Sequence, residues 1–180
     1  MAHSRTITIT IKTPFDSHVH LRRGSTLRAA ARYTAERFGR GIIMPNTEPP
    51  IETIDQAIEY KNEILAAIPV DNEFEPLMTL YLTRNLTSKT IERGARGGQG
   101  IKIFGVKYYP WGATTNSQWG HRNILDAANV FRAMEDAEVP LLVHGEVHVN
   151  KQCRRGRPLR RGSNIRKRSI AACIGPVSTT

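Results

Sequence analysis

Two histidines separated by one residue are the first feature of this 180-residue chain that could do chemistry. His18 and His20 lie in a short segment that begins with Asp16. On a strand, side chains two residues apart point to the same side, so two such imidazoles can hold one metal ion. A pair without a metal, with one ring buried and the other partly solvated, fits the pattern equally well.

A lysine and a third histidine lie at the ends of apolar runs. Lys107 follows Val106, and His144 follows Leu142-Val143. Burying an ammonium group is costly, so Lys107 either reaches solvent along its alkyl chain or serves as a reactive amine. His144 taken alone is more often a hydrogen-bonded core histidine than a ligand.

Four further polar residues could bind an anionic substrate. Arg22, next to the histidine pair, can hold an anion through its planar guanidinium group, although a surface charge is the plainer interpretation. Asn46 follows Met44-Pro45 and also fits an ordinary turn. Thr114 and Thr115 lie in a polar loop, residues 110–122, which is long enough to form a lid but also fits a plain connector.

The elements that must position these residues alternate along the chain. Apolar runs predict five strands, and amphipathic or capped segments between them predict four helices, at 16–20, 25–38, 41–44, 53–67, 76–82, 88–96, 100–109, 123–138 and 140–144. Thr53 with Gln56 forms a capping-box pattern for the second helix. In the last helix, the apolar spacing predicts a buried face made of Leu125, Ala128, Phe131 and Met134. Alternating Thr and Ile over residues 6–12 predict one more strand with a single buried face.

Strand–helix alternation of this kind is typical of parallel βαβ units. A doubly wound sheet and a (β/α)8 barrel both fit it. The candidate residues favour the barrel, because they follow the carboxyl ends of successive strands, and barrels collect their catalytic groups around one such mouth. We therefore expect an α/β fold, an incomplete (β/α)8 TIM barrel with about five of its eight βα units.

The charge of the chain is unevenly distributed. The net charge of +10 would suggest a nucleic-acid partner, but residues 1–150 hold 17 basic and all 16 acidic residues. The last 30 residues hold nine basic residues and no acid, and they lack aromatic residues. With only two cysteines, no apolar run of membrane-spanning length and no secretory signal, we expect a cytoplasmic protein without a membrane partner.

Taken together, five motifs resemble dihydroorotase, in the single-function bacterial, plant and fungal type within the amidohydrolase superfamily. The resemblance covers roughly residues 5–149 and is carried by Asp16-Ser17-His18-Val19-His20-Leu21-Arg22, Met44-Pro45-Asn46, Lys107-Tyr108-Tyr109-Pro110, Ala113-Thr114-Thr115-Asn116-Ser117 and Leu141-Leu142-Val143-His144-Gly145-Glu146-Val147. It implies a TIM barrel of the metal-dependent hydrolase type. It also implies the reversible cyclisation of N-carbamoyl-L-aspartate to L-dihydroorotate, a step of pyrimidine biosynthesis.

The resemblance also implies roles for single residues. His18 and His20 would bind a first zinc ion, His144 a second, and a carbamylated Lys107 would bridge the two Zn2+ ions. Arg22 and Asn46 would hold the substrate's carboxylate, and Thr114 and Thr115 would close over it. The family's catalytic aspartate and a further zinc-binding histidine belong to later strands, beyond the matched region. We therefore expect the chain alone to be inactive, and the family's homodimer to be doubtful for it.

Residues 1–149 are thus expected to form the N-terminal part of the barrel, and residues 150–180 a basic, disordered tail unrelated to it. Such a tail is what an out-of-frame reading of a GC-rich gene gives. The alternative is a non-catalytic barrel relic whose genuine basic tail binds nucleic acid or another polyanion. A third candidate is a hydantoinase-like amidohydrolase, against which Arg22, Asn46 and the two threonines argue, because they suit a carboxylate substrate.

Overall fold

A computed structural model describes residues 7–97 and 100–145, all of which belong to the unit Met1–His148. The expected basic tail, residues 150–180, lies outside the described residues, so its boundary and its disorder stay predictions. Within the described part, every helix is too short or too polar to cross a membrane.

Strands and helices alternate in the order that the sequence predicts. The strands are β1 (Phe15–Val19), β2 (Arg40–Ile43), β3 (Glu75–Tyr81), β4 (Gly105–Tyr108) and β5 (Leu141–Val143). The helices are α1 (Ser25–Ala35), α2 (Ile54–Ala66), α3 (Ser88–Ala95) and α4 (Ala128–Asp136), and a 3-10 turn, η2 (Ile124–Ala127), directly precedes α4.

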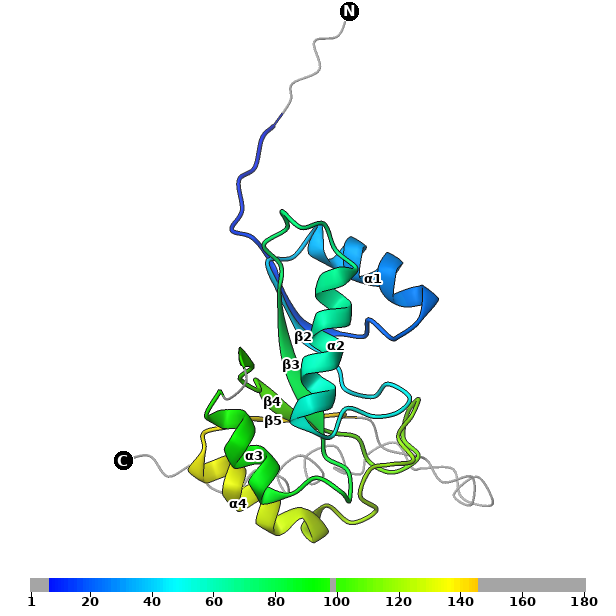
Figure 1. The fold of residues 1–180 in the computed structure, drawn as a ribbon, viewed down its shortest axis with the longest axis vertical. Coiled ribbons are helices and arrows are strands. Elements are labelled where there is room, and N and C mark those ends of the chain that lie inside the picture. Colours follow the sequence, from blue (N-terminus) through cyan, green and yellow to red (C-terminus); the bar gives the residue numbers. More distant parts are fainter. Residues whose placement is uncertain (1–6, 98–99, 146–180) are drawn as a thin grey trace, which may run out of the picture. The chain divides into compact units, whose positions relative to one another are not determined.

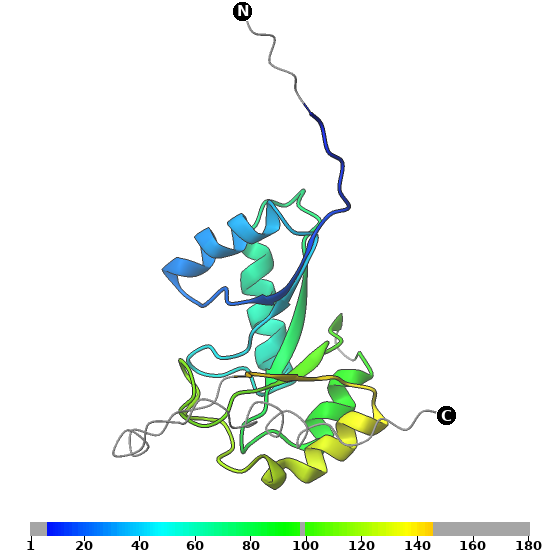
Figure 2. The ribbon, with the colours of Figure 1, turned by 180° about the vertical axis from the view of Figure 1, so that it is seen from behind.

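All five strands join one parallel sheet whose spatial order, β1-β2-β3-β4-β5, follows the chain. Leu80 of β3 pairs with Val106 of β4, which pairs in turn with Leu141 of β5. The strand direction turns strongly from β2 to β5, so the sheet curls into half a barrel (Figures 1 and 2). Because every strand is parallel, all five carboxyl ends lie along one edge.

The core lies between the curled sheet and its helices. Helix α2 packs on β3 and between α1 and α3, and α3 packs on α4. The largest fully buried side chains come from both layers and include Tyr60, Ile64, Met78, Leu80 and Ile91. This packing fixes the strands whose ends carry the candidate residues.

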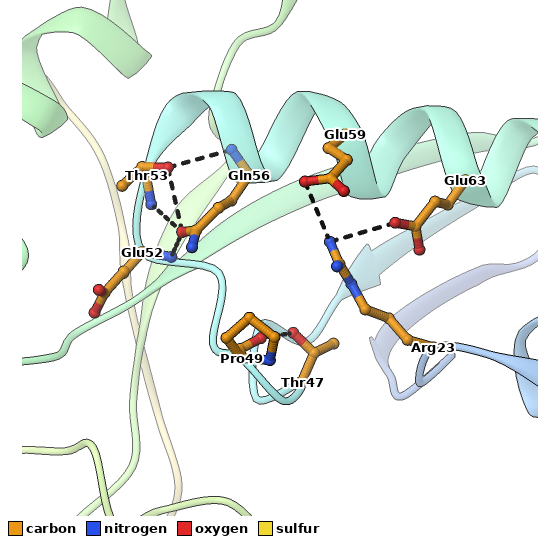
Figure 3. Close-up of polar contacts among 8 residues, drawn as sticks. All are labelled: Arg23, Thr47, Pro49, Glu52, Thr53, Gln56, Glu59 and Glu63. Atoms are coloured by element: carbon orange, nitrogen blue, oxygen red, sulfur yellow. Dashed lines mark hydrogen bonds and ion pairs between the residues drawn. The ribbon is translucent and has the colours of Figure 1, made fainter.

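The capping box predicted for α2 is present (Figure 3). The Thr53 hydroxyl accepts from the backbone N–H of Gln56 at 3.2 Å, and the Gln56 side-chain oxygen accepts from the backbone N–H of Thr53 at 3.0 Å. The same oxygen accepts from the backbone N–H of Glu52. Three backbone N–H groups at the start of the helix therefore have partners.

Replacing Thr53 with Ala should lower the free energy of unfolding by about 1 kcal/mol, the usual cost of losing an N-cap. Urea denaturation of the full chain measures it. Thr87→Ala is the matched control, because Thr87 caps α3 by accepting from the Thr90 N–H. A larger loss for Thr87→Ala than for Thr53→Ala would contradict the importance of the reciprocal contact.

Two local predictions are wrong. Residues 7–12 form no strand, and Ile7, Ile9 and Ile11 are more than 70% exposed, because no described strand lies beside them to accept their hydrogen bonds. In the last helical stretch, Leu125 is 73% exposed and Ala128 is also exposed. The 3-10 turn of η2 has three residues per turn, so it rotates the buried face to Ala127, Val130, Ala133 and Met134.

Candidate functional site

The two histidines of the first motif meet at the carboxyl end of β1. His18 lies in the strand and His20 directly after it. Their Nε2 atoms are 3.1 Å apart, and their ring centroids are 5.0 Å apart. The backbone N–H of His18 donates to Oδ1 of Asp16 at 2.9 Å, so the Asp16 side chain stabilises the backbone just before the pair. Both imidazoles thus present a nitrogen to the same point.

The surroundings keep both rings neutral. Burial, assisted by the positive charges of Arg22 and then of His18, lowers the pKa of His20 to about 4, while a hydrogen bond with Asn46 opposes this shift. Burial also lowers the pKa of His18, helped by Lys107 and His144 and opposed by Asp16. A neutral imidazole keeps a lone pair for a metal ion, so the pair has the protonation state of a ligand pair at pH 7.

Lys107 lies in β4 and is only 2% exposed. It pairs in register with Tyr81 of β3 and Leu142 of β5, so its strand has a neighbour on each side. Its Nζ is 3.4 Å from the carbonyl oxygen of Val143 and 5.3 Å from the ring centroid of Tyr109. Burial lowers the pKa of Lys107, and no ion pair within residues 7–97 and 100–145 includes it. This environment favours the neutral, nucleophilic amine.

His144 follows β5 and approaches the same region. Its backbone N–H donates to the carbonyl of Tyr108 at 2.9 Å, and its ring centroid is 5.8 Å from that of Tyr109. Among the described residues, no three side chains of the His, Cys, Asp and Glu types form a group that could hold one metal ion. The donors are two imidazoles from β1, one after β5 and the amine of Lys107 between them. Such a set fits metal ions only if the lysine contributes a ligand.

Asn46 joins the site to the loop of residues 110–122. It is 2% exposed, and its amide nitrogen donates to the carbonyl of Thr115 at 2.9 Å. Its side-chain oxygen accepts from the Tyr109 hydroxyl at 3.1 Å, and its backbone carbonyl accepts from Asn116 at 3.0 Å. Asn46 therefore anchors this loop, a role that sequence reasoning missed together with Tyr109 and Asn116.

The loop has its own internal turn. The Thr114 N–H donates to the Ser117 hydroxyl at 3.0 Å, and that hydroxyl donates to the Thr114 carbonyl at 2.6 Å. The carbonyl oxygen of Thr115 accepts the hydrogen bond from the Asn46 side chain. Both predicted threonines thus lie in the segment that Asn46 anchors, and the buried Ser117 fixes the turn.

Arg22 follows the histidine pair in a left-handed backbone conformation, with φ of 63°. Its charge lowers the pKa of His20 and opposes the rise that burial causes in the pKa of Tyr109. The same charge opposes the rise that burial causes in the pKa of Tyr60. The carbonyl of Arg22 accepts from the hydroxyl of Tyr60, a residue on α2 that sequence reasoning did not single out.

Searches of known proteins match this chain to dihydroorotases, although no family model matches it. A dihydroorotase from Acaryochloris marina is 48% identical over 139 residues, which are 77% of this chain and 39% of that protein. The dihydroorotase structure from Campylobacter jejuni superposes with a TM-score of 0.67 at 38% identity, over 77% of this chain and 39% of that one.

Two further structures agree. The dihydroorotase from Saccharomyces cerevisiae, in complex with 5-fluoroorotic acid, gives a TM-score of 0.66 at 34% identity, over 76% of this chain and 37% of that one. An L-hydantoinase from Arthrobacter aurescens gives 0.55 at 16% identity, over 73% of this chain and 29% of that one, which supports the fold alone.

The curled half-barrel thus corresponds to part of the TIM barrel in the dihydroorotase structures it superposes on, which are amidohydrolases, a class of enzymes that use metal cofactors. Within this class, the chain is a homologue of the dihydroorotases, and it spans about two-fifths of the length of the curated relatives it matches. The predicted fold class and the predicted resemblance are confirmed. Nothing in the comparisons supports the alternative of a polyanion-binding relic.

Proposed function

We propose that this chain provides part of a dihydroorotase active site, which interconverts N-carbamoyl-L-aspartate and L-dihydroorotate. The observation that carries the proposal is that a neutral histidine pair and a buried lysine, which forms no ion pair within the described residues, lie at the carboxyl edge of one parallel sheet. The location that suits this chemistry is the cytoplasm, where the two cysteines stay reduced.

The donor set would hold a first zinc ion and supply part of the ligands of a second, whose further histidine lies outside the matched region. His18 and His20 would hold the first and His144 the second, with Lys107 between them. The neutral amine of Lys107 can add to CO2, forming an N–C bond and releasing one proton, and the resulting carbamate anion would be a ligand for both ions. Burial disfavours the positive charge of a protonated Lys107. The carbamate carries a negative charge instead, which two divalent cations would stabilise. When bound, the metal ions polarise the reacting carbonyl group and make a water molecule acidic.

The remaining candidates would bind and orient the substrate. Arg22 would pair with the α-carboxylate through its guanidinium group. One amide proton of Asn46 goes to Thr115, which leaves the second for a carboxylate oxygen. Thr114 and Thr115 would cover the bound molecule. None of the eight candidate residues is a carboxylic acid, so this set binds and orients but does not supply the proton-transfer group of a hydrolysis.

Zinc binding to the full chain at pH 7 in bicarbonate buffer tests the metal part. We expect His18→Ala and His20→Ala each to weaken zinc binding at least tenfold in isothermal titration calorimetry, because each removes a direct ligand. His3→Ala is the matched control, since the proposal gives His3 no role. Equal zinc affinity in all four proteins would overturn the proposed metal site.

A further inference from the structure

The backbone of Arg22 is held in a conformation that its side chain does not favour. Its φ of 63° lies in the left-handed region, where a residue with a β-carbon is normally at a disadvantage. Gly24, two residues later, has φ of 68° without such a cost. Some contact must therefore stabilise Arg22 in place.

The contact comes from α2. The hydroxyl of Tyr60 donates to the carbonyl oxygen of Arg22 at 2.7 Å, although the two residues are 38 positions apart. Tyr60 is completely buried, and burial raises its pKa, so the hydroxyl keeps its proton and remains a donor. A short bond from a fixed helix to one peptide plane restricts the backbone rotation on both sides of that plane.

Arg23, the next residue, contacts the ring of the same tyrosine. The guanidinium carbon of Arg23 lies 5.3 Å from the ring centroid of Tyr60. Its Nη2 is 3.9 Å from Glu59 and 3.5 Å from Glu63, so Arg23 is directed at α2 (Figure 3). The charge of Arg22 acts on the pKa values of His20, Tyr60 and Tyr109. Tyr60 thus contacts both consecutive arginines, the backbone carbonyl of Arg22 and the side chain of Arg23.

We propose that Tyr60 is a positioning residue, which holds Arg22 in its left-handed conformation and thereby directs the Arg22 guanidinium group at the substrate's carboxylate. The backbone part of this inference stands on the structure alone. The part that concerns the carboxylate rests on the proposed function. Arg23 helps to hold the Tyr60 ring in place through its cation–π contact.

NMR of the isotopically labelled full chain tests the backbone part without substrate or metal. Arg22 should show the strong amide-to-Hα NOE within the residue that marks a positive φ, and Tyr60→Phe should weaken it. Tyr33→Phe is the matched control, because Tyr33 also stacks with an arginine, Arg37 at 5.2 Å, but is 63% exposed. An unchanged NOE in Tyr60→Phe would overturn the proposal.

A double-mutant cycle tests the carboxylate part. Binding of N-carbamoyl-L-aspartate to the zinc-loaded full chain should weaken about fivefold in Tyr60→Phe, as expected for one lost hydrogen bond. In an Arg22→Ala background, Tyr60→Phe should have no further effect. Equal weakening in both backgrounds would show that Tyr60 does not act through Arg22. If Arg22→Ala alone binds like the unsubstituted chain, the carboxylate role in the proposed function is wrong, while the NOE still decides the backbone part.

Discussion

Replacing Lys107 with Met should make the metal-free chain more stable and remove most of its zinc binding. The side chain is 2% exposed, and burial lowers its pKa, so the folded state carries the cost of an amine that prefers water. Met fills a similar volume without that cost, which should raise the free energy of unfolding at pH 7 by about 1–3 kcal/mol. The same change removes the amine that would form the metal-bridging carbamate.

The sign of the pH dependence follows from the same shift. The folded-state pKa of Lys107 lies below the ordinary value of 10.5, so the unfolded chain binds more protons in the window between the two values. Stability should therefore rise as the pH increases through that window towards 10.5, and Lys107→Met should remove this rise. Urea denaturation across the range, with the exposed Lys102→Met as control, measures both effects. A Lys107→Met chain that is less stable and still binds zinc would contradict both.

Acid should destabilise the metal-free chain through His20. Its pKa is lowered from 6.5 to about 4, so the unfolded state binds more protons between these pH values, and stability is lost as the pH falls from 6.5 towards 4. His18, whose pKa is also lowered, adds to this loss. Because the pair is partly exposed, we expect a loss from His20 of about 1–2 kcal/mol rather than the full value of the shift.

Thermal or urea denaturation at pH 4 to 7 measures this loss. His20→Gln should flatten the slope, because an amide does not titrate in this range. Saturating zinc should steepen it, since protons then compete with the metal for the same nitrogens. A slope that is the same with and without His20 would show that other groups cause the acid instability.

The strand order was accessible from sequence because strands buried in a parallel sheet are continuous apolar runs. Ile42, Ile43, Leu80 and Val106 all have this character and are buried. The strand predicted over residues 7–12 is absent for a different reason. Alternating polar and apolar residues show which side chains of a strand would be buried, but not whether a neighbouring strand exists to pair with it. The failure at 123–138 arose because a 3-10 turn changes the phase of the helix without an apolar signal of its own.

Site residues could be predicted from sequence where their residue type is unusual for its position. A histidine pair and a lysine inside apolar runs are unusual, so His18, His20 and Lys107 could be selected from sequence. Tyr60 could not, because its ring fits the apolar face of α2 and its partner, the Arg22 carbonyl, is a backbone atom far away in the chain. Asn46 was selected as a binding residue, but its contacts with the loop depend on tertiary structure alone.

The strand order has a consequence for biosynthesis. Each strand pairs with the one made just before it, so no pairing in the described sheet waits for a distant segment. Chains are synthesised at about 5–20 residues per second, whereas local contacts form far faster. Each βα unit can therefore dock on its predecessor while the ribosome is still making the next. The order of synthesis becomes the order of assembly, and the histidine pair is in place before the lysine that faces it is translated.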